Sequence, residues 1–258
     1  MNIFDLSSKN IVMFGGSGYL GSATAKAMLD LGAKVLIADR FPDYALKNVK
    51  HLEDNPNCIL YECDLQDTNQ IRGAYNKCVE SFGGFNAMVN LATFGPSNSV
   101  EKMTDEEWAL GMEGTINTSF RAIRECVPFF EKNHNSCIVN TGSMYGVVSP
   151  DYRIYGTSGQ NNPANYGAGK AAVIMLTKYC AAHLAPKNIR VNCVTPGPFP
   201  DDRKLPPKEF LQALSDKTML GRVGKNHEIA GAYCYLVSDA ASFTTGANLI
   251  VDGGWTAW

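Results

Sequence analysis

Short apolar runs alternate with longer amphipathic stretches along most of the chain. The apolar runs have the length of β-strands, and the stretches between them repeat their apolar positions at helical spacing. Strands are predicted at residues 10–14, 34–38, 58–61, 87–91, 137–140, 189–194 and 249–251. Helices are predicted at 19–31, near 44–52, from Asp67, from Thr104, and from about 164 to 184.

This order of strands and helices favours an α/β fold in which a parallel sheet is covered by helices on both faces. No internal repeat or low-complexity linker interrupts the order, so we expect residues 1–258 to form a single domain. The helix expected from Thr104 opens with Thr104 and Glu107, the two residues of a capping box. The stretch 196–207, rich in proline, glycine and charge, is predicted to be a mobile loop of the kind that covers a site.

Composition and charge exclude several classes of protein. The 258 residues are 45% apolar and 19% charged with a formal net charge of −2, which gives no reason to expect a nucleic-acid or membrane partner. No run approaches the ~20 apolar residues of a membrane span. The first ten residues, MNIFDLSSKN, lack the features of a signal peptide. We therefore expect a cytoplasmic protein.

The eight cysteines are expected to be buried, reduced thiols. They form no C-x-x-C pair and have no histidines at metal-ligand spacing, so no metal site is predicted. Most of them fall within apolar strand or helix patterns, where a free cysteine behaves as a small hydrophobic residue.

A glycine-rich turn lies between the first strand and the first helix. Residues 15–21 read GGSGYLG, so that Gly15, Gly18 and Gly21 allow the backbone to approach a phosphate at the positive end of the helix dipole. Asp39 ends the second strand, eighteen residues after Gly21, close to the spacing at which a carboxylate binds an adenosine ribose. The combination predicts a dinucleotide site.

Asp39 favours NAD over NADP, because its carboxylate would repel a 2′-phosphate and suits free ribose hydroxyls. The guanidinium of Arg40 could instead accept a phosphate or stack on the adenine. The glycine-rich turn itself contains no basic residue. Asp64 and Leu65, just after the third strand, are candidates for a contact on the adenine side, or simply turn residues.

Tyr166 and Lys170 stand four residues apart, on one face of a predicted helix. A phenol has a pKa of ~10 and is a poor base at neutral pH, but a nearby cation favours its ionised form. The hydroxyl of Ser143 could hold a substrate oxygen while Tyr166 exchanges a proton with it. The three residues predict acid–base chemistry on a hydroxyl or keto group.

With these motifs the sequence resembles the short-chain dehydrogenase/reductase family, in its compact single-domain branch. The resemblance implies a Rossmann-type doubly wound parallel sheet of about seven strands and an NAD(P)-dependent oxidoreductase that interconverts a secondary alcohol and a ketone. It also implies a homotetramer or homodimer. The matching text is the glycine-rich turn, Asp39, Asp64-Leu65, Val89-Asn90-Leu91-Ala92, Ile138 to Ser143, Tyr166 to Lys170, Ile189 to Gly197 and Val251-Asp252-Gly253-Gly254.

The resemblance also assigns roles to individual residues. It implies that Ser143 polarises the substrate, that Tyr166 is the general acid and base, and that Lys170 binds the nicotinamide ribose and adjusts the pKa of the tyrosine. The implied cofactor contacts are Gly15, Ser17, Gly18, Tyr19, Leu20, Gly21, Asp39, Arg40, Asp64, Leu65, Asn90, Ala92, Tyr166, Lys170, Pro196 and Gly197.

Four places depart from the pattern of the family. One is Asn90-Leu91-Ala92-Thr93, which matches the family's N-N-A-G only in part. Tyr19 stands where compact members usually have glycine, and Asp201 stands where a threonine usually follows the Pro-Gly pair. The family's catalytic asparagine falls on Thr115. Either Thr115 holds a relay water, or Asn117 does so if the helix register is shifted.

Ser143 and Tyr166 are separated by twenty-three residues, roughly ten more than in compact family members. The added polar and aromatic text, 149–165, lies beside the catalytic pair in the chain and is either a subunit contact or a substrate pocket. In the second case Arg153, Tyr155, Gln160 and Asn161 would bind a polar, polyhydroxylated substrate such as a sugar, a sugar acid or a polyol.

Two other functions fit parts of the sequence. A non-catalytic NAD sensor would explain Thr115, but it would not need Ser143, Tyr166 and Lys170. A nucleotide-sugar epimerase or dehydratase would explain the glycine spacing, but such enzymes have a longer C-terminal substrate domain, and the text here runs only four residues past Gly254.

Overall fold

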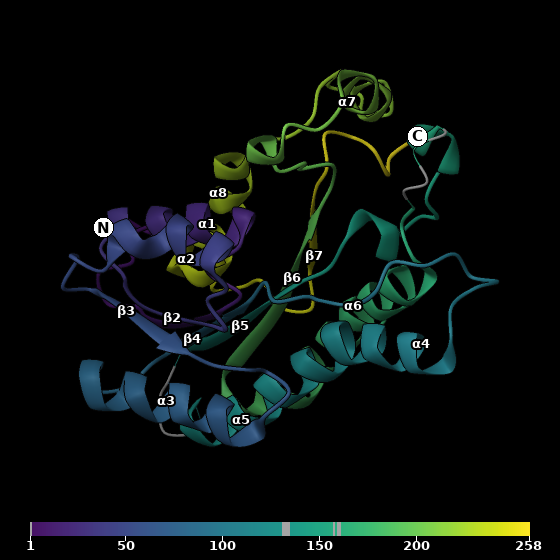
Figure 1. Ribbon diagram of the computed structural model, residues 1–258. Coiled ribbons are helices and arrows are strands. Elements are labelled where there is room, and N and C mark those ends of the chain that lie inside the picture. The colour runs from purple at the N-terminus through teal and green to yellow at the C-terminus, as the bar shows by residue number, and fades with distance from the viewer. Residues whose placement is uncertain (1, 131–134, 157, 159–160) are drawn as a thin grey trace.

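A single parallel sheet organises the computed structural model, which describes residues 2–130, 135–156, 158 and 161–258. Within these residues the sheet has seven strands in the order β3-β2-β1-β4-β5-β6-β7 (Figure 1). The strands are β1 (Asn10–Phe14), β2 (Lys34–Asp39), β3 (Cys58–Glu62), β4 (Ala87–Asn90), β5 (Ser136–Thr141), β6 (Ile189–Pro196) and β7 (Asn248–Val251).

Helices cover both faces of the sheet, so the predicted doubly wound α/β architecture is confirmed (Figure 1). Helices α1 and α8 pack against each other on one face, and α3, α5 and α6 lie on the other. The helices are α1 (Tyr19–Asp30), α2 (Asp43–Val49), α3 (Thr68–Phe82), α4 (Asp105–Met112), α5 (Thr118–Phe130), α6 (Ala164–Leu184), α7 (Lys208–Ser215) and α8 (Asn226–Val237).

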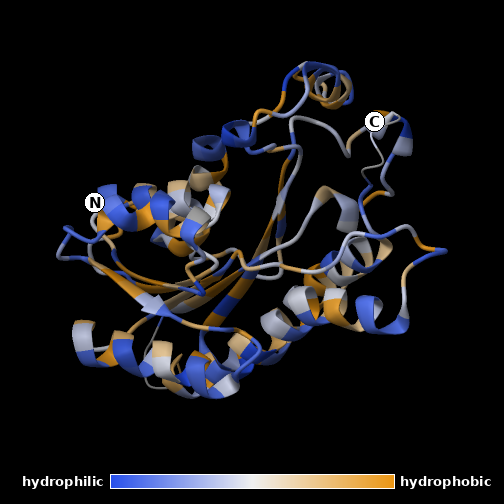
Figure 2. Cartoon of the chain, viewed as in Figure 1, coloured by the Kyte–Doolittle hydropathy of each residue, from blue (hydrophilic) through white to orange (hydrophobic). Residues whose placement is uncertain are grey.

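Strand β1 shows how the sequence pattern builds two cores. Its side chains alternate between the faces of the sheet, so Ile11 and Met13 enter the core under α1 and α8, whereas Val12 and Phe14 enter the core under α3, α5 and α6. Both faces are buried, which explains why the strands read as continuous apolar runs. Figure 2 shows these hydrophobic strands between helices whose outer surfaces are hydrophilic.

The strand order reverses between β1 and β4, since the chain winds outward through β2 and β3 and then returns to the other side of β1. In open α/β sheets, ligands bind at such a switch point, beyond the carboxyl ends of the strands. The glycine-rich turn after β1 and the loop after β4 meet here. A Cβ atom on Gly15 would lie 2.5 Å from the backbone nitrogen of Ala92.

Several local expectations are confirmed. The capping box at Thr104 and Glu107 is present at the start of α4, and α6 has the predicted bounds. All eight cysteines are buried, and burial raises the pKa of their thiols, that of Cys78 to about 12. In the part of the chain that the structure describes, no helix is both long and apolar enough to cross a bilayer.

Candidate active site

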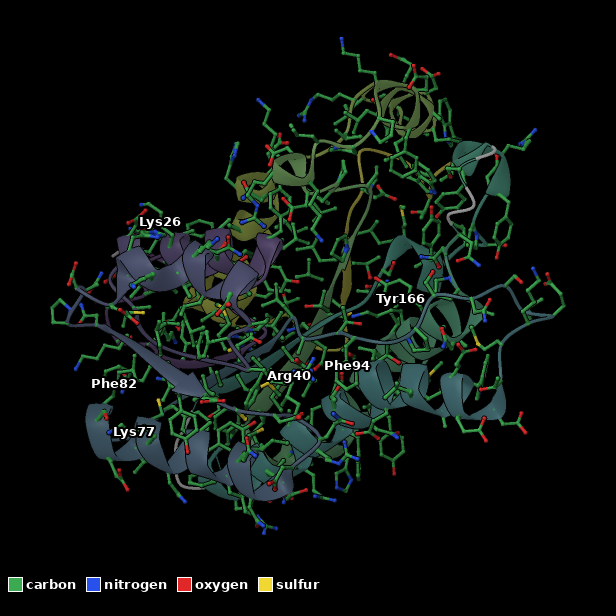
Figure 3. The ribbon with its side chains drawn as sticks, viewed as in Figure 1. Lys26, Arg40, Lys77, Phe82, Phe94 and Tyr166 are labelled. Carbon is green, nitrogen blue, oxygen red and sulfur yellow. The ribbon has the colours of Figure 1, made fainter. Side chains whose placement is uncertain are left out.

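A cavity of about 540 Å³ opens at the switch point of the sheet. It extends from the glycine-rich turn past Asp39 and the loop after β4 to Ser143 and Tyr166, so it joins the two groups of candidate residues. Figure 3 shows Arg40 and Phe94 at this edge of the sheet and Tyr166 farther along. The other predicted residues that line it are Gly15, Ser17, Gly18, Tyr19, Leu20, Gly21, Asp64, Leu65, Ala92, Lys170, Pro196 and Gly197.

Glycine is required at both ends of the turn. Gly15 has a φ of +72°, and a Cβ atom on Gly21 would lie 2.3 Å from the carbonyl oxygen of Gly15. Helix α1 begins at Tyr19, and its first residues line the cavity, so the positive end of the helix dipole lies at this site. A dinucleotide diphosphate fits this arrangement of close backbone and helix N-terminus.

Asp39 is held at the mouth of the turn. Its Oδ2 accepts hydrogen bonds from the backbone nitrogen of Ser17 at 3.2 Å and from the Ser17 hydroxyl at 2.6 Å, and its Oδ1 accepts one from the backbone nitrogen of Arg40 at 2.8 Å. The guanidinium of Arg40 lies over the ring of Phe94, 5.1 Å from its centroid. A half-buried carboxylate in this position fits the ribose hydroxyls of an adenosine.

Asn90 serves the backbone rather than the cavity. Only 2% exposed, it donates to the Ser119 hydroxyl at 3.1 Å and accepts from the backbone nitrogen of Ala92 at 3.1 Å. It thereby fixes the loop that carries Ala92 past the glycine-rich turn. The structure therefore favours an indirect role for Asn90, and leaves Ala92 as the residue that faces the cavity.

The three candidate catalytic residues come from β5 and α6. Ser143 follows β5 and is 6% exposed, and Tyr166 and Lys170 lie one turn apart near the start of α6. The Lys170 ammonium donates to the carbonyl of Thr141 at 2.8 Å and lies 5.8 Å from the ring centroid of Tyr166. The lysine is therefore fixed beneath the phenol by the end of the neighbouring strand.

Burial sets the acid–base properties of this group. It lowers the pKa of Lys170, which is 2% exposed, to about 8. Burial also raises the pKa of Tyr166, whereas hydrogen bonding with the Ser143 hydroxyl lowers it and the nearby Tyr155 raises it. The hydrogen bond with Ser143 thus favours the ionised form of the Tyr166 phenol.

The structure separates the two alternatives for the relay position. Thr115 lies in a π-helical turn between α4 and α5, is 1% exposed, and donates to the carbonyl of Gly111 at 2.8 Å. A Cβ atom on Gly169 would lie 1.9 Å from its hydroxyl oxygen, so Thr115 packs against α6 beside Lys170. Asn117 is exposed and donates to Glu113 at 2.9 Å, on the outer side of the helix. Its geometry does not fit a relay.

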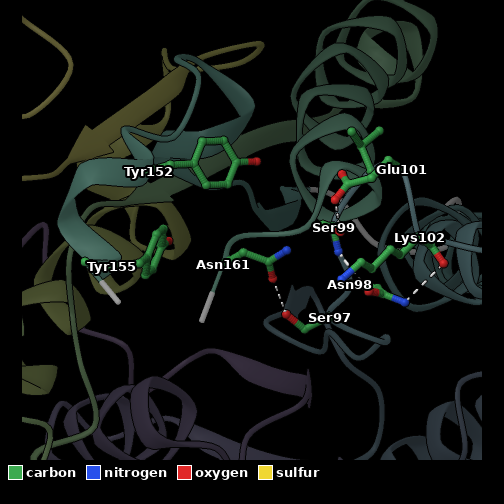
Figure 4. Close-up of a pocket in the computed structure, with 10 residues that line it drawn as sticks. Ser97, Asn98, Ser99, Glu101, Lys102, Tyr152, Tyr155 and Asn161 are labelled. Atoms are coloured by element: carbon green, nitrogen blue, oxygen red, sulfur yellow. Dashed lines mark hydrogen bonds between the residues drawn. The ribbon is translucent and has the colours of Figure 1, made fainter. Parts of the chain in front are cut away.

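Some of the residues expected to bind the substrate line a cavity, and others do not. Tyr155 and Asn161 line a second cavity of about 620 Å³, together with Ser97 and the loop that follows it (Figure 4). The expectation for Arg153 does not fit the structure, because its side chain is 86% exposed and is paired with Asp151 at 2.7 Å. Aspartate two residues before the arginine provides a local partner that holds it at the surface. Gln160 lies outside the described residues.

Other side chains at the site were not identified from the sequence. Asn48 donates to the carbonyl of Ser17 in the glycine-rich turn at 2.7 Å, and Phe199 lines the same cavity. Tyr145 hydrogen-bonds to Tyr155, and burial raises the pKa of both phenols. These contacts join residues that are far apart in the chain or in irregular segments, and no periodic pattern marks them. Phe199 and Arg203 did have a signal, because both lie in the stretch 196–207 that was predicted to cover a site.

Comparison with known proteins agrees with this geometry. The family model described as Enoyl-(Acyl carrier protein) reductase matches residues 18–256. The 3-oxoacyl-[acyl-carrier-protein] reductase FabG of Thermotoga maritima is 34% identical over 252 residues, which are 96% of this chain and 98% of that protein. The cyclopentanol dehydrogenase of Comamonas sp. is 31% identical over 256 residues, 98% of both proteins.

Solved structures show the same fold. A short chain dehydrogenase from Leptospira borgpetersenii with bound NAD+ has a TM-score of 0.85 at 29% identity, covering 98% of this chain and 95% of that one. A gluconate 5-dehydrogenase from Burkholderia cenocepacia, in complex with NADP and tartrate, has a TM-score of 0.87 at 24% identity, covering 100% of this chain and 98% of that one.

The parallel sheet and the glycine-rich turn at its switch point define a Rossmann-type nucleotide-binding protein. The full-length matches narrow the assignment. The chain belongs to the short-chain dehydrogenase/reductase family, and it is an oxidoreductase of the kind that binds a nicotinamide cofactor.

Proposed function

We propose that the protein oxidises a secondary alcohol to a ketone, or reduces the ketone, with NAD as the hydride carrier. The observation that supports this is that one cavity holds Ser143, Tyr166 and Lys170 at one end and the glycine-rich turn and Asp39 at the other. Bound NAD would supply the hydride acceptor beside Tyr166.

The residues of the chain would handle the hydroxyl proton. In the direction of oxidation, Ser143 holds the substrate oxygen and the phenolate of Tyr166 removes its proton as the hydride leaves the carbon. Lys170 favours that phenolate by its charge, and its hydrogen bond to Thr141 keeps it in position. In reduction, Tyr166 returns the proton to the carbonyl oxygen.

Asp39 supports NAD rather than NADP. Its carboxylate is fixed by Ser17 and by the backbone of Arg40, so it cannot turn away from a 2′-phosphate without losing these hydrogen bonds. Arg40 rests on Phe94 instead of facing Asp39.

The test is a substrate screen with NAD and NADP that follows the appearance of NADH or NADPH absorbance. We expect turnover with at least one group among sugar acids, polyols and cyclic secondary alcohols, and a preference for NAD. Binding of NAD without turnover of any of these alcohols, and without reduction of the matching ketones by NADH, would contradict the proposal.

We further propose that the substrate is polar and polyhydroxylated. The second cavity is lined by hydroxyl and amide groups, and Ser97 donates to Asn161 across it at 2.8 Å (Figure 4). Tyr155 borders this cavity and also acts electrostatically on Tyr166, so a substrate held at Tyr166 could extend past Tyr155 toward Asn161. An apolar chain bound here would take these polar groups out of water without offering them hydrogen bonds, which is unfavourable.

Replacing Asn161 with alanine is expected to raise KM for a polyol or sugar acid about tenfold, since one or two hydrogen bonds to hydroxyl groups are lost. The kcat should change little, because Asn161 does not contact Tyr166 in this arrangement. A secondary alcohol with a single hydroxyl group is the internal control, and its KM should not move. Equal changes for both kinds of alcohol would argue that Asn161 supports the fold and not the substrate.

We also propose a homotetramer or homodimer. Support comes from apolar side chains that α4, α5 and α6 leave exposed: Leu110 is 44% exposed, Phe120 48% and Met175 62%. Light scattering at micromolar concentration should give a mass of two or four chains. A mass of one chain would contradict this.

A further inference from the structure

The loop that follows β6 lies over the glycine-rich turn. It contains a short 3₁₀ turn, Asp202–Lys204, whose Arg203 points back to the cofactor end of the cavity. The guanidinium of Arg203 lies 4.8 Å from the ring centroid of Tyr19 and donates a hydrogen bond to the side-chain oxygen of Asn48. Asn48 in turn donates to the backbone carbonyl of Ser17.

The guanidinium is held in a defined orientation by its own loop. Its Nε donates to Asp201 Oδ1 and its Nη2 to Asp201 Oδ2, both at 2.7 Å, which is a bidentate pair. The remaining amino group, Nη1, is the one that contacts Asn48 on the side of the turn. The side chain is still 43% exposed, so a ligand can reach it.

Tyr19 explains why the arginine lies there. This residue is the first of α1 and stands where compact family members usually have glycine. Burial raises the pKa of Tyr19, and the charge and hydrogen bonding of Asp202 add to this, so the phenol stays protonated against the loop. A glycine would offer the guanidinium no ring to stack on.

The position of Arg203 also suits it to balance the negative charge of a bound diphosphate. A dinucleotide diphosphate carries two negative charges at the N-terminus of α1, and the glycine-rich turn contains no basic residue. Four basic side chains line the cavity in its described part: Arg40, Lys170, Arg203 and Lys204. Lys170 donates to the carbonyl of Thr141, and Arg40 lies over Phe94. Arg203 is ion-paired with Asp201, but its guanidinium lies over Tyr19, the first residue of α1.

We propose that Arg203 is a ligand of the cofactor diphosphate, brought to the glycine-rich turn by stacking on Tyr19. A phosphate oxygen replaces Asn48 as the acceptor for Nη1, while Asp201 keeps the rest of the guanidinium in place. Tyr19 and Arg203 therefore act as a pair: the departure from glycine in the turn is matched by a cation in the loop. This inference rests on the proposed binding of NAD.

The test compares nucleotides with and without a diphosphate. NADH binding is followed by its fluorescence, and ADP-ribose and adenosine by competition with NADH. Arg203→Ala is expected to lower the affinity for NADH and for ADP-ribose about tenfold or more, because a charge-assisted hydrogen bond is lost. The affinity for adenosine should stay within twofold of that of the wild type. Arg203→Lys should lose part of the affinity for NADH and ADP-ribose, since it keeps the charge but not the planar group.

Tyr19→Gly tests the pairing. It should weaken ADP-ribose as Arg203→Ala does, and the double variant should be no weaker than Arg203→Ala alone. Lys208→Ala, an exposed change at the start of α7, is the matched control and should bind as wild type. Unchanged ADP-ribose affinity in Arg203→Ala, or an equal loss for adenosine, would overturn the inference. Because the experiment measures nucleotide binding, it tests the role of Arg203 whether or not the protein oxidises any alcohol.

Discussion

Replacing Tyr166 with phenylalanine is expected to lower kcat/KM for alcohol oxidation by about 10³-fold, the usual loss when a positioned general base is removed. The ring would keep its place on α6 above Lys170, so only the hydroxyl that is coupled to Ser143 disappears. NADH affinity should stay within twofold, because the lost oxygen takes part in proton transfer and not in holding the adenosine end.

Two measurements separate an effect on the rate from an effect on cofactor binding. Stopped-flow or steady-state NADH formation gives the rate, and NADH fluorescence titration gives the affinity of the same preparation. Tyr179→Phe is the matched control, since Tyr179 lies on the same helix and is 68% exposed. A Tyr166→Phe protein with more than a tenth of wild-type kcat/KM would show that another group moves the proton.

The sequence was sufficient to predict the fold. It was also sufficient to predict that the glycine-rich turn with Asp39 and the group Ser143, Tyr166 and Lys170 share one site. Strand and helix periods, the glycines and Asp39 each respond to local rules, and parallel topology then brings the loops after β1, β2, β4 and β5 to one edge. Strand boundaries moved by at most two residues, as for β5, predicted at 137–140 and observed as Ser136–Thr141.

Side-chain direction was the part that local rules could not supply. Thr115 and Asn117 are two residues apart, and which of them faces α6 depends on the π-helical turn at Glu113–Asn117, an irregularity without a sequence period. Arg153 had the right chemistry for a substrate contact, but Asp151 and a further pair between Asp151 and Lys217 keep that group of charges at the surface. Helices α7 and α8 were not predicted, because no clear helical spacing was recognised after the proline-rich stretch 196–207.

Lys170→Met is expected to lower alcohol oxidation at pH 7 by about 10²-fold or more, since the cation that favours the Tyr166 phenolate is removed. Burial raises the pKa of Tyr166 and hydrogen bonding with Ser143 lowers it. We expect the loss of the neighbouring ammonium to raise that pKa further. The rate should therefore rise with pH over a more alkaline range than in the wild type. A pH profile of kcat/KM from pH 6 to 10 shows the difference, and an unshifted profile with lower rates would mean that Lys170 acts only on binding.

The same variant should be more stable than the wild type at pH 7. The pKa of Lys170 falls from 10.5 in the unfolded chain to about 8 in the folded one, so the buried charge costs about 3 kcal/mol below pH 8. Methionine removes that cost but leaves the Thr141 carbonyl without its donor, a loss of about 1 kcal/mol. The free energy of unfolding is therefore expected to rise by about 2 kcal/mol.

The pH dependence of this gain identifies its cause. Between pH 8 and 10.5 the unfolded wild-type chain holds a proton on Lys170 that the folded chain has lost, so wild-type stability from this group rises with pH. The advantage of Lys170→Met should shrink across that window and reverse above it. Urea unfolding at pH 7, 9 and 10.5 measures the difference, and Lys77→Met, an exposed change on α3, should show none of it. A constant difference at all three pH values would mean that packing, and not the buried ammonium, sets the stability of the site.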